Sequence, residues 1–230
     1  IADAARLDWT AVDPSIFGTL FERGMDPAKR SQLGAHYTSR ADIETLIEPV
    51  VMQPLRRRWD DVRQTAENLL ETGRKSGKPR KKKASKGVMT RARNEARRMI
   101  TRFHDDLTQV RVLDPACGSG NFLYVTLQKL LDLEKQVVVY MGTRLSESRT
   151  PLVGPWQLFG IELSPYAHDL AQMTVWIGYI QWMRTNGYHI DRDPGLRPMD
   201  NFQNKDAILD LSDPEHPKEP EQPVPAGGRI

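Results

Sequence analysis

Apolar residues recur along this chain in two patterns. Recurrence every three to four positions predicts helices over residues 40–51, 59–72, 88–107, 120–139 and 165–187, and part of residues 1–30 has the same character. Short apolar runs in RVLDPA, QLFGIEL and FQNKDAIL predict three strands, the first of them buried. From residue 88 onward helices and strands therefore alternate, an order that favours a parallel sheet with right-handed crossovers.

Several residues set the expected ends of the helices. Ser39 is a good N-cap because Asp42 and Glu44 follow it in the first turn of the next helix. Pro49 and Pro54 are expected to kink or break that helix. Glycine, serine and proline in GRKSGKPRKKKASKG, residues 73–87, predict a flexible basic loop.

Composition narrows the class of protein. The chain has 230 residues, of which 39 % are hydrophobic, and no stretch approaches the roughly 20 apolar residues of a membrane span. The opening IADAARLDWT lacks an initiating Met and the features of a signal peptide, so we interpret the chain as a piece of a longer protein. Cys117 is the single cysteine, which excludes an intramolecular disulfide and favours a reducing cytoplasm.

Charge is distributed unevenly. The net charge is only +3, yet 12 basic residues stand against one acid, Glu95, between Arg74 and Arg98. The rest of the chain must therefore be net negative. Such a local basic block favours a polyanionic partner more strongly than the overall charge does.

The stretch VLDPACGSGNF, residues 112–122, joins a predicted strand to a predicted helix through a turn with two glycines. Gly118 and Gly120 would let a ligand approach the backbone, and the helix offers free N–H groups near Asn121. The turn has no Lys, which phosphate-binding loops need, and Asp114 would repel a phosphate. An acid suits a cationic amino group instead, such as the methionine part of S-adenosylmethionine. A purely structural turn is the alternative.

Acids also follow the other two predicted strands. Glu162 would accept hydrogen bonds from the two hydroxyls of a ribose, and Asp206 would contact an adenine amino group. Each acid taken alone could be a solvated side chain. Three acids after three successive strands favour a nucleoside-containing ligand at the carboxyl ends of the strands.

These stretches resemble the motifs of S-adenosylmethionine-dependent N6-adenine DNA methyltransferases. DPACGSGNF is similar to their motif I, LGAHYTS to motif X, FGIELSPYAHDLAQ to motif II and DAIL to motif III. Over residues 32–209 the set is most similar to the large bacterial enzymes of restriction–modification and phage defence, the MmeI-like, BREX and DISARM methyltransferases. The resemblance implies an α/β fold with a Rossmann-like class I methyltransferase core, which is a partial parallel sheet with flanking helices.

The resemblance also divides the chain and assigns roles. It implies an N-terminal helical segment at residues 1–31, a core at 32–212 with a basic helical insertion at 60–108, and a Pro-rich disordered linker at 213–230. It implies that S-adenosylmethionine contacts His36, Tyr37, Thr38, Asp114, Ala116, Cys117, Gly118, Gly120, Asn121, Phe122, Glu162, Leu163, Asp206 and Ala207. Cys117 is interpreted as a small residue of the turn and not as a nucleophile.

The catalytic motif of the family, Asn/Asp/Ser-Pro-Pro followed by an aromatic residue, is missing. The chain contains no Pro-Pro dipeptide, and the motif would follow Asp206 after one further strand. Its polar side chain would accept hydrogen bonds from the target amino group, and its aromatic ring would stack on the flipped base. We therefore expect no catalytic residue in this chain, and we expect the rest of the polypeptide, with other defence-system proteins, among its partners.

The basic block is expected to contact the DNA backbone, because each neutralised phosphate adds salt-sensitive affinity. The residues proposed for this contact are Lys78, Arg80, Lys81, Lys82, Lys83, Lys86, Arg91 and Arg93. A solvated loop without a partner is the alternative. No metal site and no membrane contact are expected. Two further functions stay open: methyl transfer to RNA or protein, and a non-catalytic nucleic-acid-binding module that holds the methyl donor as a ligand.

Overall fold

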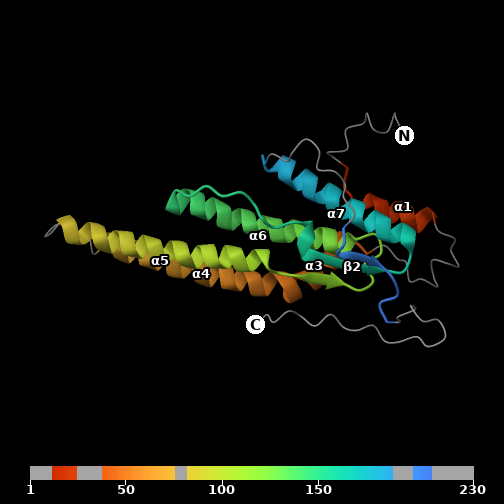
Figure 1. The fold of residues 1–230 in the computed structure, drawn as a ribbon, viewed down its shortest axis with the longest axis horizontal. Coiled ribbons are helices and arrows are strands. Elements are labelled where there is room, and N and C mark those ends of the chain that lie inside the picture. The colour runs from red at the N-terminus through yellow and green to blue at the C-terminus, as the bar shows by residue number, and fades with distance from the viewer. Residues whose placement is uncertain (1–11, 25–37, 76–81, 189–198, 209–230) are drawn as a thin grey trace.

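The structure is a computed structural model, and it describes residues 12–24, 38–75, 82–188 and 199–208. The molecule is elongated, with a small sheet at one end and a long helical hairpin reaching away from it (Figure 1). His36, Tyr37 and the predicted linker at 213–230 lie outside the described residues. Among the described helices, none is long and apolar enough to cross a membrane.

Three short strands form the sheet. They are β1 (Val112–Asp114), β2 (Leu158–Glu162) and β3 (Phe202–Asn204), and they pair in parallel in the order β1-β2-β3. Helix α6 (Asn121–Leu145) connects β1 to β2, and α7 (Pro165–Thr185) leads from β2 toward β3. The alternation of elements and the parallel pairing predicted from the sequence are confirmed.

One face of the sheet is covered by helices, and the other face is more exposed. Paired residues in neighbouring parallel strands point to the same side, so Leu158, Gly160 and Phe202 share one face. Helices α6 and α7 pack on the sheet and on each other, and Leu158 and Phe202 are buried at 0 % and 5 % exposure. On the other face Leu113 is 54 % exposed. The expectation that the first strand is buried was therefore wrong for its central residue.

The helices before the sheet run on across both prolines. Helix α1 (Ile16–Gly24) comes first, and α3 (Arg40–Ile47) begins at Ser39, whose hydroxyl accepts a bond from Asp42 N–H at 3.3 Å. A π-helical turn, η2 (Glu48–Met52), then leads without a break into α4 (Gln53–Lys75). Of the kink or break expected at these prolines, no break occurs, because the wider π turn shifts the backbone bonding and accommodates residues that lack an N–H.

Helices α4 and α5 (Lys82–Thr108) form the hairpin, and they include residues 73–75 and 82–87, which were predicted to belong to a loop. Gly73 was interpreted as a breaker at the start of a loop. It lies instead inside α4, buried, where an added Cβ would stand 3.0 Å from the Ala92 Cβ. The absence of a side chain lets the two helices pack closely there. Further along the interface, the Trp59 and Phe103 rings lie 5.3 Å apart.

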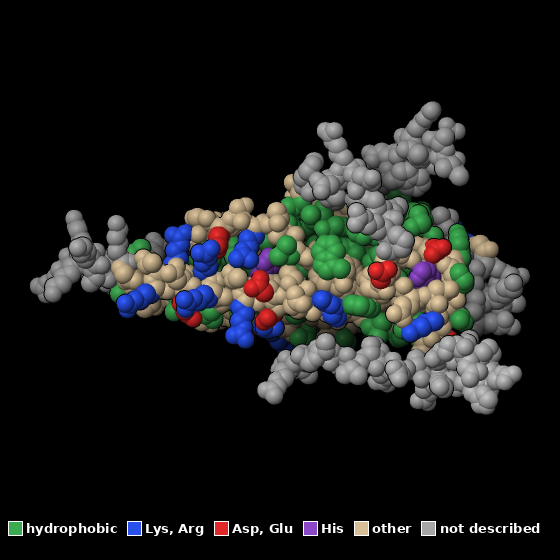
Figure 2. All heavy atoms as spheres, viewed as in Figure 1, with side chains coloured by type: hydrophobic (Ala, Val, Ile, Leu, Met, Phe, Trp, Pro, Cys, Tyr) green, Lys and Arg blue, Asp and Glu red, His purple; other side chains and the backbone are tan. Residues whose placement is uncertain are grey.

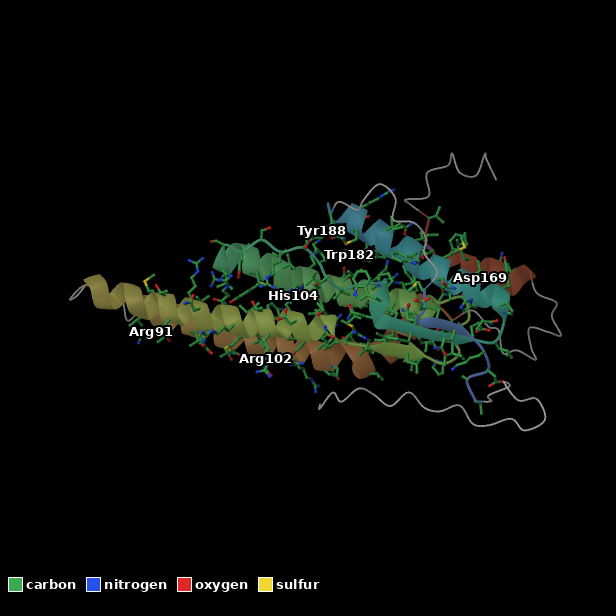
Figure 3. The ribbon with its side chains drawn as sticks, in the orientation of Figure 1. Arg91, Arg102, His104, Asp169, Trp182 and Tyr188 are labelled. Atoms are coloured by element: carbon green, nitrogen blue, oxygen red, sulfur yellow. The ribbon has the colours of Figure 1, made fainter. Side chains whose placement is uncertain are left out.

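A buried polar contact joins the hairpin to α6. His104 Nε2 lies 2.7 Å from a carboxylate oxygen of Glu134, and both side chains are fully buried (Figure 3). The same carboxylate accepts bonds from the backbone N–H groups of Leu152 and Val153, at 2.7 and 3.0 Å. Glu134 therefore holds α5, α6 and the segment after α6 in one arrangement. Sequence reasoning assigned no role to either residue.

Candidate cofactor site

The turn after β1 crosses the carboxyl end of β2. Cys117 N–H donates to the Ile161 carbonyl at 3.0 Å, and Gly120 N–H donates to the Cys117 carbonyl at 2.8 Å. The Cys117 Sγ lies over Gly160, where an added Cβ would approach it to 2.9 Å. The absence of a side chain at Gly160 thus lets the turn pack directly against the sheet.

Gly118 and Gly120 serve different purposes, although both have positive φ, +53° and +83°. An added Cβ at Gly120 would stand 2.9 Å from the Ala171 Cα on α7, so this glycine permits close packing. An added Cβ at Gly118 would meet no described atom within 4 Å. The backbone at Gly118 therefore faces open space, which is the side from which a ligand would approach.

Glu162 at the end of β2 is bonded directly to this turn. One carboxylate oxygen accepts from Gly118 N–H at 2.9 Å, and the other accepts from Ser164 N–H at 2.8 Å. A carboxylate offers about four lone-pair sites, so both oxygens retain capacity for further donors such as ribose hydroxyls. The contact brings together two motifs that lie 44 residues apart in sequence.

Asp114 lies beside this pair at the end of β1. One of its oxygens accepts from Ala116 N–H at 3.1 Å. Burial raises the pKa of Asp114 above its usual value, the bond from Ala116 opposes the rise, and the nearby Glu162 carboxylate adds to it. Two acids are thus held close together without a cation among the described residues. A cationic ligand would relieve that repulsion.

Cys117 is buried under the same turn. Burial, with the two neighbouring carboxylates, raises the pKa of its thiol to about 12. A thiol with such a pKa is protonated at neutral pH and is a poor nucleophile. This agrees with the interpretation of Cys117 as a packing residue.

The end of β3 is bonded to the same edge. The Asn204 side chain donates to the carbonyls of Glu162 and Leu163 at 2.7 and 3.1 Å, and Lys205 N–H donates to the Glu162 carbonyl at 3.2 Å. Sequence reasoning missed Asn204, although an amide at a strand end is a recognisable signal. Asp206 follows two residues later, and it accepts from Ile208 N–H at 2.7 Å.

The start of α6 completes the site. Gly120 is its N-cap and provides no side chain, so the first backbone N–H groups have no side-chain cap. Asn121 is 8 % exposed, and its Oδ1 accepts no bond from any described residue. Helix α1 packs on this turn, since an added Cβ at Gly18 would meet Ser119 Oγ at 2.5 Å. Apart from a glycine within a helix, no sequence feature indicated that contact.

The other proposed contact residues vary in position. Thr38 is half-buried just before the Ser39 cap, and Phe122 is half-buried in the first turn of α6. Ala116 and Leu163 are exposed, and Ala207 is half-buried beyond β3. In the described part of the chain no cluster of histidine, cysteine and acidic residues could hold a metal ion.

The residues proposed for DNA contact lie on or before α5. Lys78, Arg80 and Lys81 are outside the described residues, and Lys82, Lys83 and Lys86 belong to the first turns of α5. Arg91 is exposed on α5, and Arg93 donates to the Leu145 carbonyl at the end of α6. Figure 2 shows Lys and Arg side chains gathered over the half of this face that carries the hairpin.

Comparison with known proteins identifies the family of this chain. The sequence model of the family described as MmeI, DNA-methyltransferase domain, matches residues 89–203, which is half of the chain. The chain belongs to the MmeI DNA-methyltransferase family. The match begins within α5 and ends within β3, so it includes all the strand-end residues of the site up to Gln203.

The curated relatives that this chain matches are much longer than the chain, which spans less than a fifth of their length. DNA methyltransferase A of Bacillus subtilis is 28 % identical over 172 residues, which cover 74 % of this chain and 16 % of that protein. A putative type II restriction enzyme and methyltransferase of Methanocaldococcus jannaschii is 24 % identical over 184 residues, 74 % of this chain and 14 % of that protein. Among solved structures, the type IIL restriction–modification enzyme MmeI in complex with DNA matches with a TM-score of 0.65 and 29 % identity. That match covers 90 % of this chain and 24 % of MmeI.

Proposed function

We propose that this chain is the S-adenosylmethionine-binding part of a Rossmann-like, site-specific DNA adenine-N6 methyltransferase of a bacterial restriction–modification or anti-phage system. The observation that carries the proposal is the bond from Gly118 N–H to the Glu162 carboxylate, beside Asp114. It brings the glycine turn and two acids to one sheet edge, the edge at which open α/β sheets bind ligands. Family membership supplies the reaction class.

The residues present fit this cofactor. S-adenosylmethionine supplies a methyl group on a positively charged sulfur, and its methionine end carries an ammonium group. Asp114 would accept from that ammonium, and the open backbone at Gly118 would allow the approach. Glu162 would use its remaining lone pairs to accept from the ribose hydroxyls. Asp206 and Ala207 would flank the adenine edge, with Leu163 against its ring.

The residues that receive the target base would come from outside this chain. No Pro-Pro dipeptide occurs in the 230 residues. The described sheet also leaves Leu113 exposed on a face that parallel sheets normally cover, which fits a domain completed by further sequence. We infer that these residues bind and present the methyl donor, and that a downstream motif holds the adenine.

Two measurements test the proposal. The first is calorimetry of S-adenosylmethionine with the natural full-length protein, in which Glu162→Gln should weaken binding about 10- to 100-fold, the range for hydrogen bonds to a charged group. Asp60→Asn, which removes an exposed acid from α4, is the control.

The second measurement identifies the acceptor. Full-length protein, duplex DNA and methyl-labelled cofactor should give label in N6-methyladenine after digestion to nucleosides. Label in a cytosine product, in RNA or in protein would refute the adenine assignment while leaving cofactor binding intact. Absence of cofactor binding would refute the proposal as a whole.

A further inference from the structure

An arginine-lined groove lies along the outer face of α5, apart from the cofactor site. It has a volume of about 550 Å³, and its walls come from α5 and from the segment that follows α6. The lining consists wholly of polar and charged residues: Asn94, Arg97, Arg98, Thr101, Arg102 and Arg149, with Asp105 at one end. These arginines lie beyond Arg91 and Arg93 along the chain.

The helix period explains how α5 carries this groove. Ala96, Ile100, Phe103 and Leu107 recur every three to four residues and form its buried side. Asn94, Arg98, Thr101, Arg102 and Asp105 recur at the same spacing on the outer side. From Asn94 to Asp105 this outer face is about 16 Å long at 1.5 Å per residue, the length of roughly five base-pair steps of duplex.

The second wall is held in place by backbone hydrogen bonds to Glu134 and by an ion pair with α5. Glu134 accepts from the N–H groups of Leu152 and Val153, and Arg97 pairs with Glu147 in the same segment. Arg149 is thereby placed against α5, where it donates to Thr101 Oγ1 at 3.3 Å. The groove is consequently a preformed feature of the fold.

Two of the arginines are available to a ligand. Arg98 is 80 % exposed, and only a 3.5 Å contact joins it to Glu95. Arg102 lies exposed on the hairpin (Figure 3), and it makes no ion pair or hydrogen bond with any other described residue. A guanidinium group presents a planar set of donors that matches phosphate oxygens in a bidentate way.

The lining indicates which polyanion fits. The groove contains no aromatic or apolar residue, so it offers no stacking platform for single-stranded bases and no apolar centre for a protein partner. Binding the phosphates of a rigid double helix requires neither a stacking platform nor an apolar centre. Resting on the proposed function, we propose that this groove binds the phosphate backbone of duplex DNA through Arg98 and Arg102.

The groove lies far from the methyl donor. Helix α5 leads into β1 in the same general direction (Figure 1), so Arg98 is roughly 30 Å from Asp114 by helix and strand rise. The residues that line the groove are also distinct from all those assigned to the cofactor. The contact should therefore contribute affinity irrespective of sequence and leave cofactor binding unchanged.

The test uses the natural full-length protein and a fluorescent duplex of about 30 base pairs, several times the length of the groove, titrated over a series of salt concentrations. Arg98→Gln with Arg102→Gln should lower the slope of log affinity against log salt by about 1.8, since each phosphate contact contributes about 0.9. A slope lower by about 1.8 corresponds to a loss of DNA affinity of up to about 60-fold at 0.1 M salt. Arg57→Gln with Arg184→Gln, which removes the same charge elsewhere, should leave the slope unchanged.

Each result decides the matter. Arg98→Lys with Arg102→Lys should restore most of the slope, because the charge is retained, and this variant also guards against misfolding. A double glutamine variant that behaves like the control would overturn the proposal. So would a greater loss of affinity for single-stranded RNA than for duplex DNA. If the wild type binds S-adenosylmethionine but no duplex, the groove proposal fails while the cofactor proposal stands.

Discussion

The carboxyl-end edge of the sheet and the α4–α5 hairpin place their charges in opposite ways. At the edge, Asp114 and Glu162 are half-buried and bonded to backbone N–H groups. On the hairpin, Arg91 and Arg102 are exposed at the ends of long side chains. The difference matches two kinds of ligand, because a small cofactor requires a preorganised site and a polyanion requires only accessible charge.

The largest effect should come from the buried contact that joins the hairpin to α6, the helix that begins at the sheet edge. Glu134→Ala would leave buried His104 and the N–H groups of Leu152 and Val153 without their acceptor. We expect a loss of about 3–5 kcal/mol in the free energy of unfolding, measured by chemical denaturation. Glu67→Ala breaks the exposed pair with Arg144 and should cost less than about 1 kcal/mol. Similar losses for both would contradict the role assigned to Glu134.

The next largest effects should come from substituting the two glycines at the sheet edge. Gly120→Ala adds a clash with Ala171 to the strain of positive φ, and should destabilise by about 3 kcal/mol in total. Gly118→Ala carries only the strain, about 1–2 kcal/mol, but its methyl group would project toward the ligand. Denaturation and calorimetry should therefore separate them: Gly120→Ala mainly lowers stability, and Gly118→Ala mainly lowers cofactor affinity.

A smaller effect is expected from Asp114. Asp114→Asn should weaken S-adenosylmethionine binding about 10- to 100-fold, the range for losing a charged hydrogen bond. It should not lower stability at pH 7, because the raised pKa means that the ionised carboxylate opposes folding above its folded pKa. The difference in stability between Asp114→Asn and the wild type should disappear as the pH falls below the pKa of Asp114 in the unfolded chain.

The same carboxyl gives cofactor binding a pH dependence. Only the ionised form attracts an ammonium group, so affinity should fall as the pH drops through the pKa of Asp114, at a pH above that of an ordinary aspartate. Calorimetry across this range should show the fall in the wild type and a flatter profile in Asp114→Asn. An equal dependence in both proteins would rule out Asp114 as the titrating group.

The smallest effect should come from a substitution on the hairpin that changes DNA binding and leaves cofactor binding at the sheet edge unchanged. Arg91→Gln should reduce the salt slope of DNA binding by about 0.9 and the affinity at 0.1 M salt by up to about eightfold. S-adenosylmethionine affinity should stay unchanged, because Arg91 is far along α5 from the strand ends (Figure 3). Arg184→Gln, on α7, provides the control. A change in cofactor affinity would show that the two regions are coupled.

Much of the edge could be predicted from sequence because its signals are local. Apolar runs identified the strands, the glycines identified the turn, and the acids followed directly. The contact between Gly118 and Glu162 agrees with the idea that these motifs converge. Whether they hold the cofactor as assigned stays a prediction.

The hairpin was less predictable because its determinants are contacts between elements. Gly73 and Gly87 are breakers by residue type, yet both lie within helices, and Gly73 is required for close packing against Ala92. The pair of His104 and Glu134 joins residues 30 positions apart, and no pattern along the chain marks it. The π turn at Pro49, which carries the chain through without a break, could not be predicted because a π turn is not visible as a period in the sequence.

The bare side of the sheet has a practical consequence for preparing the protein. In the described residues, Leu113 is 54 % exposed, and Phe159 and Ile161 on the same face are only half-buried. Strand β1 also presents an edge that no described strand pairs with. Unpaired edges and apolar surfaces of this kind promote self-association. These residues produced alone should therefore form soluble aggregates at high concentration, and adding the flanking sequence should remove that tendency.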